Sequence, residues 1–291
     1  MPSLPLLLSQ AFNGLALGTL LALVSSGLTI ILGTLGVLNF AHGALFMLGA
    51  YVAFVTLQYT SSFLLAVLAG CLFMLVVGVV LERGLIRLFY RRPPEDQILV
   101  TFGVGIVVVE AVRAVFGGNN QRVSVPNWGE GVTMMGFLIY PTYRLELIGI
   151  IALLLAVLWV VLYRTSIGLV VRAGIEDAGM VGILGINVRR TFLLVFALGV
   201  VAAGIAGMLY APIVSVNPDM GGSFLVQSFV VIVIGGLGSF PGAVVGGLIA
   251  GEIISLTSAF NSAYSEVMLY AVMALLLVVR PQGLFGTEGR V

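Results

Sequence analysis

The chain has 291 residues, of which 60% are hydrophobic and 9% are charged, and its formal net charge is +1. A soluble globular chain carries about 25% charged residues, so this composition could not cover the outside of a water-soluble domain. It indicates an integral membrane protein with little mass left for a soluble domain.

Several kinds of chemistry are excluded by residues that are scarce or missing. All 13 basic residues are Arg, so no lysine is present for a P-loop or a Schiff base. One histidine, His42, and one cysteine, Cys71, are too few for a zinc or iron–sulfur site. We therefore expect no catalytic residue, no metal, no cofactor and no nucleic-acid partner. Any ATP hydrolysis is expected on another chain.

Apolar runs between polar breaks predict the membrane helices. A bilayer core about 30 Å thick takes roughly 20 residues per helical crossing. The runs are apolar on every face, which excludes the alternating strands of a β-barrel. The short seventh and eighth ranges meet at a glycine-rich junction, 235–242, so they either cross twice or form a broken, partly re-entrant hairpin. The predicted ranges are 8–33, 43–59, 62–86, 98–117, 145–163, 191–214, 224–237, 241–258 and 264–280.

These ranges predict an all-α fold, a polytopic membrane helical bundle of eight or nine transmembrane helices with one or two broken or re-entrant segments. Residues 1–291 are interpreted as a single transmembrane domain. Small residues recur at four-residue spacing, as in Gly14 and Gly18 or Gly247 and Gly251. Because this spacing lets helix backbones approach closely in lipid, we expect tight packing.

The polar residues Asn39 and His42 lie between the first two predicted helices and flank Phe40 and Ala41. A polar side chain left unpaired in hydrocarbon is costly, so both must face protein, water or a ligand. One interpretation is a helix break that lines a translocation pathway, formed by Asn39, Phe40, His42 and Gly43. The other is structural, with Asn39 capping the next helix and His42 bonded to a carbonyl group.

Acidic residues inside apolar runs are further candidates. Glu110 and Arg113 are one helical turn apart, and we expect a structural ion pair between them. Glu252 has no basic residue near it in the sequence, so it would reach across helices or into a water-filled part of the pathway. A proton-relay role for Glu252 would make the protein a secondary transporter, but one isolated acid supports such a relay only weakly.

The polar segment 164–190 is long for a loop in a compact membrane bundle. Residues 169–184 within it predict a short helix with Arg172 and Glu176 at i and i+4. Its glycines weaken this helix unless another protein supports it. The mixed charges differ from the basic face of a helix that lies on lipid, so we predict a docking helix for a partner, with a membrane-surface helix as the alternative.

The arginines orient the chain, because basic residues accumulate in cytoplasmic loops. Ten of the 13 fall in the segments 83–92 and 164–190 and in the C-terminal tail. The other three lie in or beside the segment 117–143, which is therefore predicted to be an outer loop. The C-terminus is then cytoplasmic, and the N-terminus is outside if nine helices cross.

Motifs spread over nearly the whole chain carry a resemblance to a known family. They are residues 13–18, 39–43 with 49–51, 172–187, 235–243 and 280–286. In this order they resemble the high-affinity branched-chain amino acid ABC transporter permeases, H-type (Liv-type) subunit.

The resemblance implies a non-catalytic, multi-pass subunit of the bacterial inner membrane that conducts branched-chain or other hydrophobic amino acids through the lipid bilayer. The implied partners are an M-type permease subunit in a heterodimer, two ATP-binding cassette ATPases and a periplasmic substrate-binding protein. The segment 164–190 would be the cytoplasmic coupling loop that docks on an ATPase. Its implied contact residues are Arg172, Glu176, Asp177, Met180, Leu184, Gly185 and Ile186.

Other functions remain open on the sequence. A related permease for urea or short amides would share the same motifs. A proton-coupled secondary carrier would use Glu252, Glu110 or His42 as relay groups and would need no ATPase. A passive channel would need a continuous polar stripe, which the apolar runs do not show.

Overall fold

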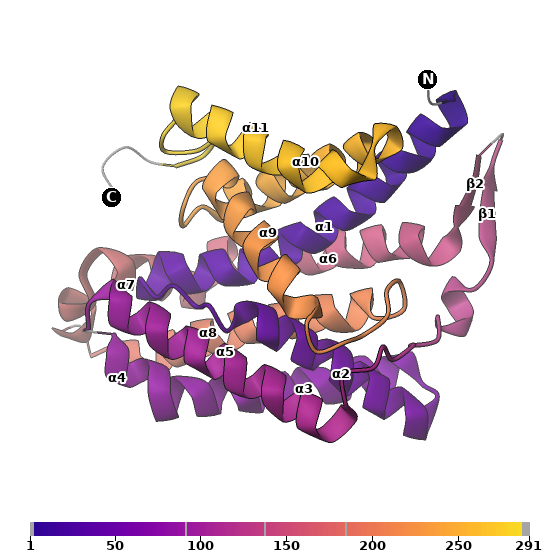
Figure 1. Ribbon diagram of the computed structural model, residues 1–291. Helices are drawn as coiled ribbons and strands as arrows, with labels where there is room; N and C mark the ends of the chain where they lie inside the picture. Colours follow the sequence, from indigo (N-terminus) through magenta and orange to yellow (C-terminus); the bar gives the residue numbers. More distant parts are fainter. Residues whose placement is uncertain (1–2, 91, 137, 184, 287–291) are drawn as a thin grey trace. The chain divides into compact units, whose positions relative to one another are not determined.

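The computed structural model describes residues 3–90, 92–136, 138–183 and 185–286, with the backbone alone for residues 174–179. Across these ranges the chain is almost entirely helical (Figure 1). The long helices are α1 (Leu4–Leu35), α2 (His42–Thr60), α3 (Phe63–Leu81), α5 (Pro94–Phe116), α6 (Thr142–Arg164), α7 (Ser166–Ile183), α8 (Val188–Tyr210), α9 (Met220–Gly235), α10 (Phe240–Phe260) and α11 (Ser265–Val279). The short elements are the π-helical turn η1 (Glu82–Ile86), α4 (Arg87–Phe89), the 3-10 helices η2 (Asn127–Gly129) and η3 (Ser262–Tyr264), and the strands β1 (Val132–Met135) and β2 (Leu138–Pro141).

Within the described ranges, 8 helices are long and apolar enough to cross a membrane. One of them is the continuous span Phe63–Phe89, which joins α3, η1 and α4. α9 has 16 residues and is therefore about 24 Å long, shorter than a bilayer core of about 30 Å. All the helices predicted from the sequence are present, and the predicted all-α membrane fold is confirmed. The predicted range 224–237 corresponds to the short helix α9.

Polar side chains and one glycine set where several helices begin and end. Ser62, Asn187 and Ser239 each accept a hydrogen bond from an amide in the first turn of the following helix, with N···O distances of 3.4, 3.1 and 3.2 Å. Such caps satisfy amides that have no acceptor within the helix. After α1, Gly36 has φ +65°, a left-handed conformation that glycine adopts without strain, and the helix stops there.

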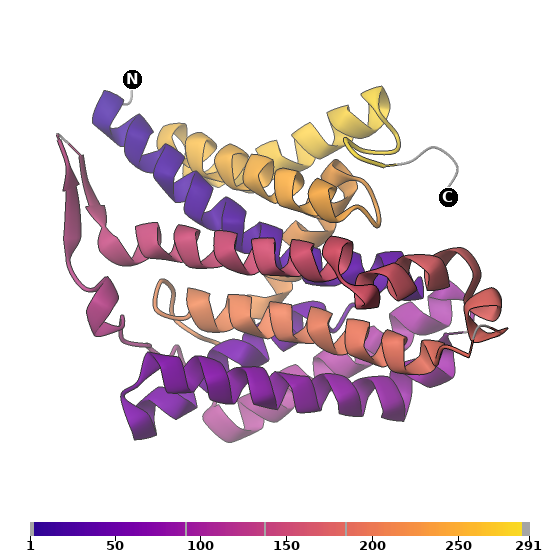
Figure 2. The same cartoon turned by 180° about the vertical axis from the view of Figure 1, so that it is seen from behind.

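The segment between α5 and α6, for which the sequence predicts only an outer loop, contains a β-hairpin (Figure 2). β1 and β2 pair antiparallel, with Val132 opposite Pro141 and Met135 opposite Leu138. Gly136, with φ +63°, follows the first strand. Each strand has only 4 residues, which is too short for alternation of polar and apolar residues to reveal it in the sequence.

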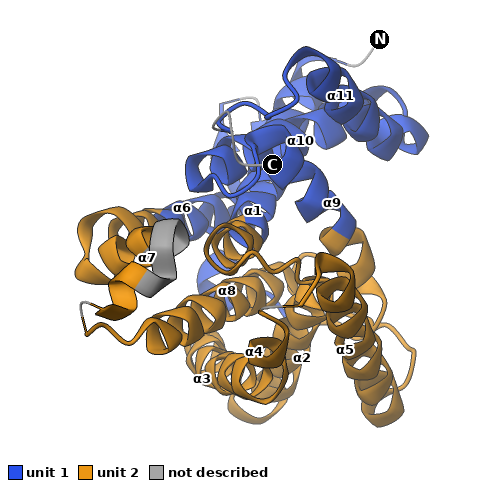
Figure 3. Ribbon diagram, turned by 90° about the vertical axis from the view of Figure 1, so that its left-hand side faces the viewer, with its two compact units in different colours: residues 1–25, 124–155, 226–291 blue, residues 26–123, 156–225 orange. Residues whose placement is uncertain are grey.

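The chain divides into two compact units, each assembled from separate stretches of sequence (Figure 3). Unit 1 contains residues 1–25, 124–155 and 226–291, and unit 2 contains residues 26–123 and 156–225. Three of the four boundaries fall inside α1, α6 and α9, so each of these helices contributes to both units.

In unit 2, α2, α3 and α8 pack closely against one another. Their buried apolar side chains form a core that includes Leu45, Met74 and Phe196. The backbone of Gly204 on α8 lies so close to Gly49 on α2 that a side chain at Gly49 would overlap it. The tight packing that small residues predict is therefore confirmed in this unit.

In unit 1, α1 and α10 approach each other through glycines. A Cβ atom at Gly251 would overlap the backbone of Gly14 and Gly18. The four-residue spacing of these glycines predicts such an approach, which is confirmed.

The junction between α9 and α10 is a tight turn held by the C-terminal segment of unit 1. The amides of Leu284 and Phe285 donate to the carbonyl groups of Ile234 and Gly235, each at 2.9 Å. The glycine-rich sequence correctly predicts a helix break here, and α10 resumes at Phe240.

Candidate functional site

The segment between α1 and α2 interrupts the helices beside α5 and is held there by hydrogen bonds. The amide of Phe40 donates to Thr101 Oγ1 at 3.0 Å. The single proton of the Thr101 hydroxyl is within hydrogen-bond distance of the carbonyl groups of Gln97, at 2.8 Å, and Leu38, at 3.1 Å. Asn39 Oδ1 accepts from the amide of Ala41 at 3.1 Å. Because Thr101 is about 10 Å along α5 from its first residue, the interruption lies within the length of that span.

Asn39 and His42 are both buried, with 1% and 0% of their surfaces exposed. α2 begins at His42, and its N-cap residue is Ala41, whose side chain makes no capping hydrogen bond. Asn39 therefore braces the turn before the helix instead of capping it. Its side-chain nitrogen is buried and has no hydrogen-bond partner among the described residues.

The first turns of α2 and α9 meet at a pair of glycines in unit 2. A Cβ atom at Gly43 would overlap the carbonyl oxygen of Gly221 and lie 2.8 Å from Leu225 Cβ. Nearby, the rings of Phe46 and Phe224 stack with their centroids 4.3 Å apart. Two helix N-termini thus lie side by side, and the positive ends of their dipoles share one region.

A cavity of about 220 Å³ lies beside these two helix starts. Its walls come from α2, α5, the first turns of α9 and the residues Phe40 and Asp219, and most of the lining is apolar. Of the predicted pathway residues, Phe40 and Gly43 line the cavity, whereas Asn39 and His42 do not. The full lining is Phe40, Gly43, Ala44, Phe102, Gly105, Ile106, Val109, Glu110, Arg113, Asp219, Gly221, Gly222 and Leu225.

One wall of this cavity carries three charges, which we call the charged wall: Glu110, Arg113 and Asp219. The predicted ion pair between Glu110 and Arg113 is present, and Arg113 also pairs with Asp219 at 2.6 Å. Asp219 lies 106 positions from Arg113 along the chain, and it is not among the site residues predicted from the sequence. The available signal was its place just before an apolar run, because acids gather at helix N-termini.

Glu252, the remaining predicted pathway residue, belongs to unit 1. It lies on α10, where a Cβ atom at Gly14 of α1 would be 2.7 Å from its carboxylate oxygen. Glu252 also lines a second cavity, of about 390 Å³, whose other lining residues carry no charge. Within the part of the chain that the structure describes, Glu252 forms no ion pair.

The segment 164–190 contains a helix, as predicted, and α7 occupies Ser166–Ile183. The Arg172 guanidinium donates to the carbonyl of Leu162, and its central carbon lies 5.5 Å from the ring centroid of Tyr163. Arg172 thereby fastens α7 to the end of α6. The side chains of Glu176 and Asp177, and residue Leu184, lie outside the described part of the chain.

The end of α7 presents apolar side chains to its surroundings. Met180 and Ile186 are exposed, and Ile183 between them is 81% exposed. Gly185 has φ +77°, so a glycine is favoured where the chain turns from α7 toward α8. Exposed apolar residues at this position fit a surface that another protein covers.

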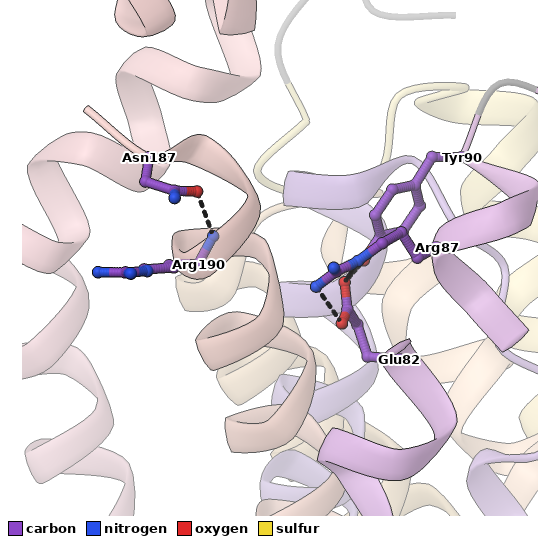
Figure 4. Close-up of polar contacts among 5 residues, drawn as sticks. All are labelled: Glu82, Arg87, Tyr90, Asn187 and Arg190. Carbon is purple, nitrogen blue, oxygen red and sulfur yellow. Dashed lines mark hydrogen bonds and ion pairs between the residues drawn. The ribbon is translucent and has the colours of Figure 1, made fainter. Parts of the chain in front are cut away.

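A buried ionic cluster lies at the end of the α3 span (Figure 4). The Glu82 side chain has no exposed surface, and Arg87 donates to both of its oxygens, at 3.1 and 2.8 Å. The Tyr90 hydroxyl donates to Glu82 at 2.9 Å, and burial together with this carboxylate raises the pKa of Tyr90. The Tyr90 ring meets Phe192 of α8 edge-on, with centroids 5.9 Å apart. From the sequence Arg87 is predicted only to lie in a cytoplasmic loop, and this cluster is not predicted.

Known proteins are similar in sequence to this chain over nearly its whole length. The family described as branched-chain amino acid transport system / permease component matches residues 10–277. The high-affinity branched-chain amino acid transport system permease protein LivH of Salmonella typhimurium is 33% identical, over 96% of this chain and 95% of its own. The corresponding protein BraD of Pseudomonas aeruginosa is 29% identical, over 98% of both chains. LivM of Escherichia coli is 26% identical, over 96% of this chain and 71% of its own.

No solved structure matches the chain. The match to the family nevertheless extends from α1 to α11. The chain therefore belongs to the permease component family of branched-chain amino acid transport systems.

Proposed function

We propose that this chain is a non-catalytic membrane subunit of an ATP-driven importer for branched-chain and other hydrophobic amino acids. The observation that carries the proposal is its similarity, over nearly its whole length, to permease proteins of high-affinity branched-chain amino acid transport systems. The lack of lysine supports the assignment of ATP hydrolysis to other subunits, because a P-loop needs that residue.

The proposed partner in the membrane is an M-type permease subunit, with which this chain would form a heterodimer. This choice is supported by alignment of the chain with both LivH and LivM proteins. Two ATP-binding cassette ATPases would supply the energy, and a periplasmic substrate-binding protein would deliver the amino acid. The complex would lie in the bacterial inner membrane, with the C-terminus of this chain on the cytoplasmic side, as the arginine distribution indicates.

The proposed translocation pathway follows the interrupted helices and includes Asn39, Phe40, His42, Gly43 and Glu252. Interrupted helices expose backbone dipoles inside the membrane, where they can meet the polar end of a substrate. The cavity beside Phe40 and Gly43 has mostly apolar walls, which suit an apolar side chain. The side-chain nitrogen of Asn39 is buried and has no hydrogen-bond partner among the described residues, so it would donate to a substrate carboxylate only in a state that opens this interruption.

The proposed coupling element is α7 with the turn that follows it. It would dock on an ATPase through Arg172, Glu176, Asp177, Met180, Leu184, Gly185 and Ile186. Support comes from the exposed apolar residues at the end of α7 and from its direct continuation into α8, which packs against α2. Closure of the ATPases would then move α8 and shift the pathway between two states.

The test is reconstitution of the chain with an M-type subunit, the two ATPases and the binding protein in proteoliposomes. We expect uptake of labelled leucine, isoleucine and valine that requires both ATP and the binding protein. Uptake of urea or short amides in place of leucine would contradict the proposed substrate. Uptake driven by a pH gradient without the ATPases would contradict the importer itself.

A further inference from the structure

We propose that the cavity between α2, α5 and α9 is a binding site for a zwitterionic α-amino acid. The charged wall binds the ammonium group, the first turn of α2 binds the carboxylate, and the apolar walls hold the side chain. The proposal rests on the proposed function and deepens it, because it assigns the charged groups of the substrate to residues of this chain.

The charged wall is exposed beside the cavity. Glu110 lies about 9 Å before the end of α5, where a charge in contact with hydrocarbon would be costly. The side chains of Glu110, Arg113 and Asp219 are nevertheless 56%, 37% and 75% exposed. Exposed charges are stable where water or a polar ligand reaches them, so a cavity beside the charged wall suits a polar ligand.

The charged wall carries an excess of negative charge. Two carboxylates and one guanidinium sum to a net charge of −1, which attracts a cation. Arg113 bonds to Oε1 of Glu110 and to Oδ1 of Asp219. Within the described part of the chain, the second oxygen of each acid accepts no hydrogen bond, so both are available to a new donor. A primary ammonium group supplies up to three N–H donors and fits this need.

The carboxylate of the ligand would lie at a helix N-terminus. Gly43 and Ala44 lie in the first turn of α2, and both line the cavity. First-turn amides have no acceptor within their own helix and favour anions. The α9 start contributes less, because the amide of Gly222 already donates to the carbonyl of Asp219 at 3.1 Å. The carboxylate of the ligand would therefore lie at the α2 start, where Gly43 and Ala44 line the cavity.

The remaining walls specify the side chain of the ligand. Phe40, Ile106, Val109 and Leu225 line the cavity with apolar surface. An apolar side chain would gain free energy by leaving water here, whereas a polar one would lose its hydrogen bonds. A neutral amide such as urea would leave the excess negative charge uncompensated. The chemistry thus favours amino acids with aliphatic or aromatic side chains.

Thiol protection tests the site directly. A cysteine is placed in the cavity as Val109→Cys in a Cys71→Ala background, and Asn119→Cys in the exposed loop after α5 is the matched control. The two permease subunits and the two ATPases are reconstituted together. The substrate-binding protein is left out, because its own specificity would otherwise dominate. Modification by a water-soluble thiol reagent is then timed with L-leucine, with 4-methylpentanoate, which lacks the amine, and with 3-methylbutylamine, which lacks the carboxylate.

We expect leucine to slow modification of Val109→Cys and to leave Asn119→Cys unchanged. Each analogue should need at least about tenfold more ligand for the same protection, because each lacks one charge-assisted interaction. Adding Asp219→Asn should raise the leucine concentration for half-protection about tenfold. With Asp219→Glu instead, this concentration should return most of the way to its original value. Glu130→Gln, in the exposed segment before β1, should have no effect.

Two results would overturn the site. One is equal protection by leucine and its two analogues, and the other is unchanged half-protection in Asp219→Asn. Either result, together with ATP-driven leucine uptake by the unmodified importer, would reject this site and keep the proposed function. Failure of the unmodified importer to transport any branched-chain amino acid would reject the proposed function instead.

Discussion

Replacing Gly43 by alanine should weaken the packing of α2 against α9 and reduce transport. The added carbon would overlap the carbonyl oxygen of Gly221 and lie 2.8 Å from Leu225 Cβ. The main obstacle is backbone, which cannot rotate away as a flexible side chain can, so the two helix starts would have to separate. Forcing an extra carbon into a well-packed interior costs about 1–3 kcal/mol.

Gly103→Ala is the matched control for this change. Gly103 lies inside α5, and a Cβ atom there would meet nothing within 4 Å. Alanine gains at most about 1 kcal/mol of helix propensity over glycine, so the control measures the gain without the clash. We expect Gly103→Ala to be neutral or stabilising, and Gly43→Ala to be less stable than this control by about 1–3 kcal/mol.

The assay is unfolding by titration of sodium dodecyl sulfate into mixed micelles, followed by circular dichroism, together with ATP-driven leucine uptake. Equal unfolding free energies for Gly43→Ala and Gly103→Ala would refute the close approach of α2 and α9. Normal uptake by a destabilised Gly43→Ala complex would refute the functional importance of that approach.

Three other changes test different parts of the structure. His42→Gln keeps one donor and one acceptor, so it should transport nearly normally without a change in pH dependence; a loss of uptake would favour a proton relay. Gly185→Trp places a bulky side chain at φ +77° beside the exposed end of α7. It should abolish substrate-stimulated ATPase activity, although the chain should still insert into the membrane. Retained stimulation would contradict docking at this turn. In a Cys71→Ala background, Asn119→Cys should be labelled by an impermeant maleimide from outside and Arg190→Cys only after permeabilisation, and the reverse pattern would contradict the orientation.

Helix positions could be predicted because each apolar run is long enough to be recognised as a helix. The predicted and observed helix boundaries differ mainly at the polar ends of helices. The sequence predicts a helix over 98–117, whereas α5 begins at Pro94, because its first turn contains Glu95 and Asp96. Proline at the first position and acids in the first turn are favourable at a helix N-terminus, although they read as loop residues by hydropathy alone.

The arrangement of the candidate site could be predicted only in part. The local pair Glu110–Arg113 follows from helical spacing, and the interruption around Asn39 follows from polar residues between two apolar runs. The meeting of Gly43 with Gly221 and of Arg113 with Asp219 depends on which helices are neighbours. A single sequence, taken without an alignment of relatives, holds no information on such long-range pairing. The cavity could therefore not be derived from it.

The hydrogen bonds of Thr101 link the folding of the helix interruption to the order of synthesis. Phe40 and Thr101 are 61 residues apart, and ribosomes add about 5–20 residues per second, so Thr101 emerges about 3–12 s after Phe40. During that interval the backbone around Phe40 needs another acceptor, because hydrocarbon supplies none. The hairpin of α1 and α2 therefore reaches its final state only after α5 enters the membrane. If α1 and α2 entered lipid ahead of α5, the Phe40 amide would lack its native acceptor until Thr101 arrives.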